Sequence, residues 1–207
     1  MNETVKLLLN AAAVALIGLV IIRLTFMETV VVADNGMAPT LVYGDEVLIW
    51  KNAEIGMADV VVCEHPARTG ELVIGRAVAF PGHTVSTDRN GTLYVDKDRA
   101  STQPVQAMRF YDVTRKRLYD MRMHLIDYFG RHSHAYFIKN NDIFQLRTYT
   151  VEKGVYLLGD NRSELSFDSR EFGEVDPARC LGQVIMRLRP APARGDDVQL
   201  GHLDLIE

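Results

Sequence analysis

The densest group of chemically capable side chains lies in the segment 159–170. It has the sequence Gly159-Asp160-Asn161-Arg162 and then, three residues later, Ser166-Phe167-Asp168-Ser169-Arg170. Carboxylates and guanidinium groups occur together here, and such pairs form charge-assisted hydrogen bonds. We interpret the two acids and two arginines mainly as a structural salt-bridge set. Hydrolysis of an amide would need more, because a nucleophile must have a base within hydrogen-bond reach.

The histidines are the next candidates for acid–base or metal chemistry. His65 follows a predicted strand and His83 lies near the end of another, and neither is placed as a base beside a nucleophile. His132 and His134 could ligate a metal, but two histidines at this spacing without further ligands are more typical of a solvated loop. We therefore expect no metal ion and no other cofactor.

Composition limits the class of partner and the use of cysteine. The 207 residues carry a net charge of -4, which gives no basic face for nucleic acid. The two cysteines, Cys63 and Cys180, are too few for a disulfide framework. Cys63 follows an apolar run and is interpreted first as a small core residue. A bridge between the two cysteines stays open.

The N-terminal segment predicts a membrane anchor. Residues 7–22 are apolar except for Asn10, and extension to Phe26 gives a length that can span a bilayer. The alternative is a cleaved signal peptide, but its best cleavage signature, at Ala33, lies far beyond the apolar run. Lys6 and Arg23 flank the two ends, so charge does not decide the orientation.

After the anchor, short β-rich runs alternate with turn signals, which favours an all-β barrel or sandwich. Asn90-Gly91 between two such runs predicts a hairpin with a type I′ turn. We expect an anchor at 1–27, a β domain at 28–189 that contains a cap or insertion at 97–153, and a loosely ordered tail at 190–207. Within the cap, Leu118, Met121, Leu125 and Phe129 have helical spacing. The runs predicted as strands are 30–32, 46–51, 59–63, 71–80, 84–87, 92–95, 155–158 and 183–188.

Four stretches, in order along the chain, resemble the conserved boxes of type I signal peptidases, peptidase family S26. Residues 35–41 (NGMAPTL), with Gly44-Asp45 after them, resemble Ser-Met-x-Pro-Thr-Leu. Residues 59–62 (DVVV) are similar to Gly-Asp-Ile-Val-Val, and 75–83 (GRAVAFPGH) to Lys-Arg-Val-Val-Gly-Leu-Pro-Gly-Asp. The segment 159–170 resembles the most specific box, Gly-Asp-Asn-Arg followed by Ser-x-Asp-Ser-Arg. The resemblance implies a mainly β, signal-peptidase/LexA-like barrel fold with one N-terminal transmembrane helix.

The resemblance also implies a Ser–Lys dyad, and this chain has neither member. The family serine falls on Gly36 and the family lysine on Gly75. The lysine would take the proton of the serine hydroxyl, and loss of one member of such a unit costs on the order of 10⁴–10⁶-fold in rate. Arg76, Asp160, Asn161, Arg162, Ser166, Asp168, Ser169 and Arg170 match the structural family positions.

Other residues near these positions do not restore the dyad. Asp34 and Thr40 lie close to Gly36 in sequence, and Arg76 stays charged and cannot act as a base. The two glycines have structural interpretations as well, Gly36 as a turn residue and Gly75 as a bulge or close-approach residue. Neither interpretation supplies a nucleophile.

Peptide binding can survive the loss of catalysis. The resemblance implies that an extended peptide lies between two segments of the β domain, as an added strand. The residues expected to line this site are Val30, Val32, Asp34, Met37, Val73 and Ile74. We also expect the backbone N–H of Gly36 to remain able to donate to a carbonyl.

The sequence therefore leads to one hypothesis and two alternatives. The hypothesis is a non-cleaving pseudo-peptidase, anchored once in the cytoplasmic membrane with its β domain on the outer or periplasmic face. Its partners would be an exported preprotein, or a factor in secretion or surface assembly, together with membrane phospholipid. The alternatives are an active signal peptidase with an unrecognised nucleophile and a decayed copy without a role.

Overall fold

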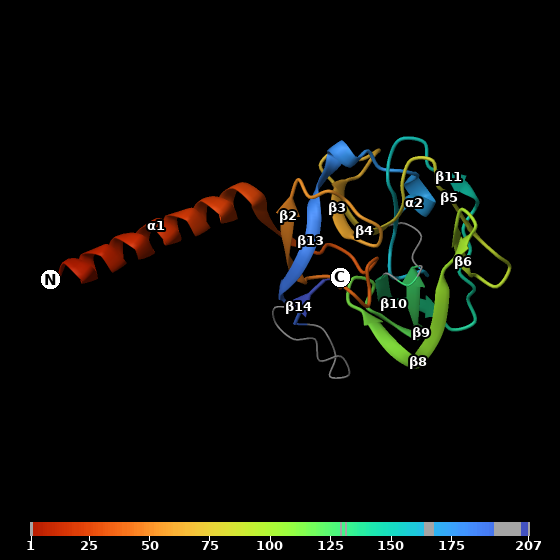
Figure 1. The fold of residues 1–207 in the computed structure, drawn as a ribbon. Coiled ribbons are helices and arrows are strands. Elements are labelled where there is room, and N and C mark those ends of the chain that lie inside the picture. Colours follow the sequence, from red (N-terminus) through yellow and green to blue (C-terminus); the bar gives the residue numbers. More distant parts are fainter. Residues whose placement is uncertain (1, 129, 131, 164–167, 193–203, 207) are drawn as a thin grey trace.

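The protein has a long N-terminal helix that stands away from a β domain (Figure 1). The computed structural model describes residues 2–128, 130, 132–163, 168–192 and 204–206. Its elements are α1 (Glu3–Phe26), β1 (Met27–Val31), β2 (Glu46–Lys51), β3 (Val60–Glu64), β4 (Leu72–Ala79), β5 (Thr84–Thr87), β6 (Leu93–Val95), β7 (Asp98–Arg99), β8 (Ser101–Asp112), β9 (Arg117–Tyr128), β10 (His132–Lys139), β11 (Tyr149–Thr150), β12 (Tyr156–Leu158), α2 (Ser169–Phe172), a 3-10 turn (Pro177–Arg179), β13 (Cys180–Arg189) and β14 (Asp204–Leu205).

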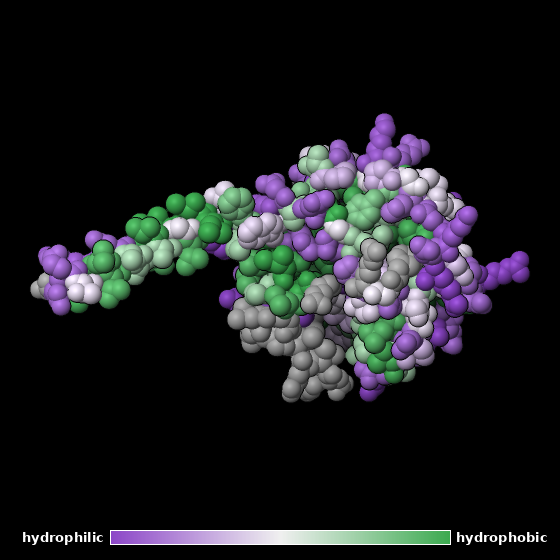
Figure 2. Space-filling view, in the orientation of Figure 1, coloured by the Kyte–Doolittle hydropathy of each residue, from purple (hydrophilic) through white to green (hydrophobic). Residues whose placement is uncertain are grey.

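Helix α1 has the length and composition to cross a membrane. It contains 24 residues, none of them buried against the domain, and is about 36 Å long. Figure 2 shows apolar residues along the helix and hydrophilic residues at its N-terminal end. At its other end Arg23 donates to the carbonyl of Met27 and to the hydroxyl of Thr29. Phe26 stacks on Trp50, with ring centroids 5.8 Å apart, and this contact joins the helix to β2.

The main sheet is open rather than a closed barrel. Its strands have the order β1-β2-β13-β3-β4-β12, and β14 adds to β13. The mainly β fold with one apolar helix agrees with the sequence-based expectation, but the expectation of a barrel is wrong, because β1 and β12 end the pairing instead of joining. One apolar cluster packs Val32, Met37 and Ile74 together, and another contains Val61, Val73 and Leu157.

A small sheet of order β11-β5-β6-β7 carries the expected hairpin. Val85 pairs with Val95 across it. The turn differs from type I′, since Gly91 has a φ of +81° whereas Asn90 is not among the residues of positive φ. The Asp88 carboxylate instead accepts hydrogen bonds from the backbone N–H groups of Asn90 and Thr92. A side chain therefore organises the loop that was expected to follow from backbone preference alone.

Strands dominate the segment 97–153, which was expected to form a cap or insertion. Its sheet has the order β10-β9-β8, with β8 and β9 forming a long hairpin. The predicted helix is wrong for Leu118, Met121 and Leu125, which lie on β9, and Phe129 lies outside the described residues. Cross-strand pairing overrides the helical spacing, as tertiary context commonly does. The tail expected at 190–207 is described only for 190–192 and 204–206.

A disulfide joins Cys63 of β3 to Cys180 at the start of β13, which settles the question that the sequence left open. The two residues are partners in the pairing of β3 with β13. The bond links positions 117 residues apart, and closing so long a loop reduces the entropy of the unfolded chain. It holds the centre of the main sheet.

Candidate functional site

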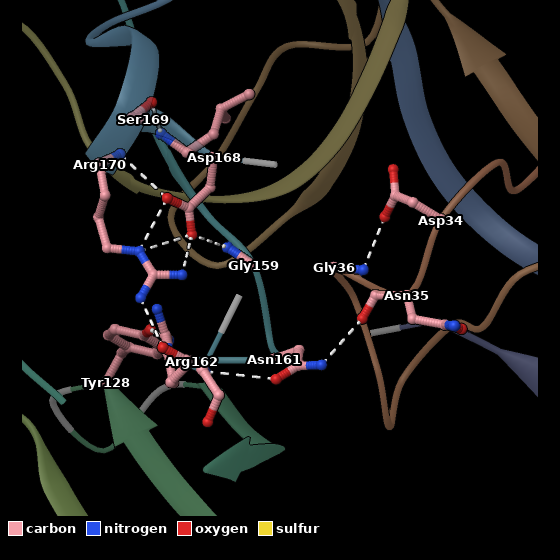
Figure 3. Close-up of polar contacts among 12 residues, drawn as sticks. Asp34, Asn35, Gly36, Tyr128, Gly159, Asn161, Arg162, Asp168, Ser169 and Arg170 are labelled. Carbon is pink, nitrogen blue, oxygen red and sulfur yellow. Dashed lines mark hydrogen bonds and ion pairs between the residues drawn. The ribbon is translucent and has the colours of Figure 1, made fainter. Parts of the chain in front are cut away.

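The loop after β1 places Gly36 against the segment that begins at Gly159. The carbonyl oxygen of Gly36 accepts a hydrogen bond of 2.8 Å from the N–H of Asn161, and the Asn161 side chain donates to the carbonyl of Asn35. A Cβ on Gly159 would lie 2.5 Å from the Gly36 oxygen, so only glycine permits this approach. Figure 3 shows the two segments side by side.

The N–H of Gly36 already has an acceptor. It donates to the carboxylate of Asp34 at 2.6 Å (Figure 3). The expectation that this N–H stays available for a peptide carbonyl is therefore wrong for the structure as it stands. A peptide oxygen could take this donor only after the Asp34 carboxylate moves away. Asp34 thus takes the donor that was expected to serve a peptide carbonyl.

A buried ionic cluster lies directly behind the loop, centred on Asp160. Its carboxylate accepts from Arg76 at 2.9 and 3.2 Å and from the hydroxyl of Thr40 at 2.5 Å. The Nε2 atom of His134 lies 3.0 Å from the same carboxylate. Burial would raise the pKa of Asp160, but Arg76 and His134 outweigh burial and hold this pKa well below its ordinary value. The side chain is therefore a permanent anion that holds three neighbours.

A second ion pair fixes the segment that follows. Arg170 donates from two nitrogens to the carboxylate of Asp168, and the same carboxylate accepts from the N–H of Gly159 at 2.9 Å (Figure 3). The hydroxyl of Ser169 accepts from the N–H of Leu157. These contacts agree with the structural interpretation of Asp168, Ser169 and Arg170. Arg162 donates to the hydroxyl of Tyr128, and Ser166 lies outside the described residues.

Gly75 lies on β4, where Leu157 of β12 covers it. A Cβ on Gly75 would lie 2.9 Å from the Cβ of Leu157, closer than real Cβ atoms approach. The backbone of Gly75 pairs with Val61 of β3, and its neighbours on the same side of the sheet form an apolar cluster that contains Val61, Val73 and Leu157. The glycine is thus a close-approach residue. The segment 157–161 contacts both glycines, Gly75 through Leu157 and Gly36 through Asn161.

The candidate replacements for the dyad have other partners. The Thr40 hydroxyl donates to Asp160, and both cysteines of the chain are in the disulfide. The Nδ1 atom of His65 accepts from two backbone N–H groups, and that of His83 accepts from the N–H of Phe80. Burial lowers the pKa of His134, whose Nε2 faces a carboxylate. None of these groups forms a nucleophile–base pair.

Two strand edges border the open part of the main sheet. Among the described residues, strand β1 pairs with β2 alone, and β12 pairs with β4 only from Arg76 onward, so residues 72–75 lie beyond β12. Of the expected lining residues, Val32, Met37 and Ile74 are buried in one cluster with Val30 at its margin, and Val73 belongs to the cluster on the other side of the sheet. Asp34 is half-buried. Most of these side chains are therefore packed within the domain, and the backbone edges of the strands remain as the place where a peptide could bind.

Sequence reasoning missed several residues of the site. His134 is buried on β10 against Asp160, so the interpretation of His132 and His134 as a solvated loop is wrong for His134, while His132 is exposed. The alternation of β10, in which Tyr136 and Ile138 are buried with His134, is the signal that could have found it. Nothing in the sequence indicates that Leu157 covers Gly75, because that contact joins strands far apart in the chain.

The comparisons with known proteins agree with these features. A family model described as signal peptidase, peptidase S26, matches residues 1–189. The chain is similar to signal peptidase IB of Staphylococcus aureus, with 27% identity over 183 residues that cover 86% of each protein. It is also similar to signal peptidase I of Streptococcus pneumoniae serotype 4, with 28% identity over 178 residues, which are 81% of this chain and 85% of that protein.

Proposed function

Because the chain belongs to the signal peptidase family, peptidase S26, we propose that it is a non-cleaving member that holds extended segments of exported proteins. The partner would be an exported preprotein or a factor in secretion or surface assembly. Positions 36 and 75, where the family serine and lysine fall, have no side chain. An acyl-transfer reaction needs an attacking atom and a group that accepts its proton.

The observation that carries the proposal is the contact between Gly75 and Leu157. A missing lysine alone would leave a gap that a repositioned base could enter. Here the Cβ of Leu157 lies 2.9 Å from where the first carbon of a side chain at position 75 would be, and apolar neighbours surround it. The packing therefore favours glycine at this position, and the fold is adapted to the absence of the lysine.

Binding of a peptide is supported by the backbone at the edge of β1, which pairs with β2 alone within the part of the chain that the structure describes. Val32 donates its N–H to the carbonyl of Asp45 and accepts at its own carbonyl from Gly44, so both its polar groups point toward the β2 side. Successive residues of a strand alternate, and the N–H of Val31 therefore points away from β2. Its side chain is exposed. An extended segment could add at this edge, as in β-augmentation.

The proposed location is a single pass through the cytoplasmic membrane with the β domain on the outer face. The family relation supports it, and so does α1, which is long and apolar enough to span. The disulfide between Cys63 and Cys180 adds independent support, because such bonds persist in oxidising compartments and are rare in the cytosol.

Cleavage and binding are tested separately on the full chain in detergent. A preprotein with an Ala-x-Ala site should remain uncut, whereas a fluorescent peptide that covers its signal sequence should bind. Cleavage by the parent protein at the expected site would overturn the proposal in favour of an active peptidase. Absence of both cleavage and binding would favour a decayed copy.

A matched pair of variants tests the edge itself. Val31→Pro removes the N–H that points away from β2, and proline is tolerated on an edge strand when its nitrogen faces solvent. Val31→Ala shortens the same side chain and keeps the N–H. Peptide binding should fall at least tenfold in Val31→Pro and stay within about twofold of the parent in Val31→Ala, at equal thermal stability. Equal binding by both variants would exclude pairing at this edge.

A further inference from the structure

The last strand, β14, lies on the same edge of β13 as β3. Among the described residues, β3 pairs with β13 at Cys180–Gln183, and β14 pairs with it at Met186 and Arg187. Strand β2 pairs with β13 along both stretches, from Gly182 to Arg189. A strand has two hydrogen-bonding edges, so β3 and β14 share the edge that β2 leaves. In Figure 1, β14 lies at the lower end of β13, where it continues the row of β3.

Ile206, directly after β14, packs against the apolar cluster that contains most of the expected peptide-lining residues. Its N–H donates to the carbonyl of Ile185 at 3.2 Å, and its side chain is half-buried. Two other half-buried residues, Val30 and Leu72, pack against the same cluster. Val30 belongs to β1 and Leu72 to β4, the strands whose edges border the open part of the main sheet. The margin of the cluster thus combines both edges with the chain's own segment 204–206.

An extended peptide at β1 would place side chains over this margin. The side chains of a strand alternate between the two faces of its sheet, so every second side chain of an added strand would lie on the face of Val30. Val32, Met37 and Ile74, deeper in the cluster, are already buried. The half-buried margin is therefore the part of the cluster that a peptide side chain can cover, and Ile206 covers some of it.

The contact of β14 is small enough to be exchanged. The strand has two residues, and Leu205 on it is 69% exposed. A strand this short adds little stability by itself, but the covalent tether keeps it at an effective concentration on the order of millimolar. A weak contact of this kind stays occupied in the free protein and is lost to a ligand that binds more tightly.

We propose that residues 204–206 are an internal ligand of this apolar cluster and that a bound peptide displaces them. The inference rests on the proposed function, because it concerns the regulation of the same site. A peptide then binds only when its contacts with the β1 edge and the cluster margin exceed those of the tethered segment. Since Ile206 is the side chain to be replaced, the displacing peptide presents an aliphatic side chain to the margin.

Two single variants of neighbouring residues test this competition. The full chain in detergent is titrated with the fluorescent signal-sequence peptide. Ile206→Ser removes the half-buried side chain and should raise the affinity for the peptide about fivefold, since roughly half of the burial of an isoleucine is lost from the competing contact. Leu205→Ser removes an exposed side chain of the same segment and should stay within about twofold of the parent. Equal or lower affinity in Ile206→Ser would assign β14 a purely structural role and overturn this inference alone.

Hydrogen exchange of the parent protein gives a test that needs no variant. The amide of Ile206 is bonded to the carbonyl of Ile185, and displacement breaks this bond. Saturating peptide should therefore speed exchange of the Ile206 amide by about threefold or more, as followed by NMR. Unchanged or slower exchange at saturation would show that peptide and segment are bound together, against the inference. A peptide that binds neither the parent nor the two variants would overturn the proposed function and this inference together.

Discussion

The Cβ of Leu157 lies 2.9 Å from the position that a Cβ on Gly75 would take. This contact connects β4, which carries the proposed position of the family base at Gly75, to β12, which leads into the Asp160 cluster. The backbone of Leu157 is also fixed by a hydrogen bond, because its N–H donates to the hydroxyl of Ser169. The leucine therefore cannot move away without disturbing the segment that carries Asp160 and Asp168.

Gly75→Ala should destabilise the protein although it adds one methyl group. The new Cβ would meet the Cβ of Leu157, a backbone-fixed atom, and overpacking of this kind costs about 1–3 kcal/mol. Thermal unfolding in detergent measures the effect as a lower midpoint. Gly18→Ala is the control, because nothing lies within 4 Å of a Cβ at position 18. An unchanged midpoint for Gly75→Ala would show that the two strands separate freely.

Restoring the dyad should require space as well as the two side chains. Gly36→Ser with Gly75→Lys should give a protein of reduced stability and little or no cleavage, because the lysine stem meets Leu157. Addition of Leu157→Gly removes both the Cβ that lies 2.9 Å and the Cδ1 that lies 3.6 Å from the new Cβ, and it should raise cleavage of an Ala-x-Ala preprotein. Leu157→Gly alone should remain inactive. Equal rates for the double and triple variants would contradict this role of the leucine.

Asp160→Asn should cost about 3–5 kcal/mol of unfolding free energy, since it leaves the buried Arg76 without its counter-charge. Denaturant unfolding measures this loss. The matched surface change is Glu71→Gln, which removes the partner of Arg68 in a pair whose side chains are both 48% exposed. It should cost less than about 1 kcal/mol. Comparable losses in the two variants would mean that the Asp160 cluster adds nothing beyond an exposed pair.

Stability should fall on mild acidification, in part through His134. Burial lowers the pKa of His134 below the ordinary value of 6.5, with Arg76 and Arg162 acting in the same direction and Asp160 against it. The unfolded chain therefore binds the proton more readily, so the contribution is complete above about pH 6.5 and is lost as the pH falls below it. His65 and His124, whose pKa values burial also lowers, act with the same sign.

Unfolding free energies measured between pH 7.5 and 5 test this assignment. His134→Gln should show a smaller fall than the parent, and the residual fall belongs to His65 and His124. His132→Gln, an exposed change on the same strand, should reproduce the parent profile. A His134→Gln profile identical to the parent would remove His134 from the pH response.

Much of the strand content followed from local pattern. The β-branched runs predicted β2, β3, β4 and β13 close to their observed bounds, because alternation and turn residues act over a few residues. The helical spacing of Leu118, Met121 and Leu125 gave a wrong prediction of a helix, because a long hairpin can place the same side chains on either of its faces. The prediction of a closed barrel was wrong, because the pairing of strands at the ends of the sheet depends on segments that lie far apart in the sequence.

The sequence by itself determined the family and the apolar helix, and it predicts that Gly36 and Gly75 lie at the catalytic positions, because each of these is a matter of residue type and order along the chain. Only the tertiary structure decided that Leu157 covers Gly75, that Asp34 takes the N–H of Gly36, that His134 joins Asp160 and that Cys63 bonds Cys180. The physical reason is the separation along the chain over which each kind of interaction acts. Propensity and motif act between neighbours, whereas steric contact, ion pairing and disulfide geometry join atoms that the chain brings together only when it folds.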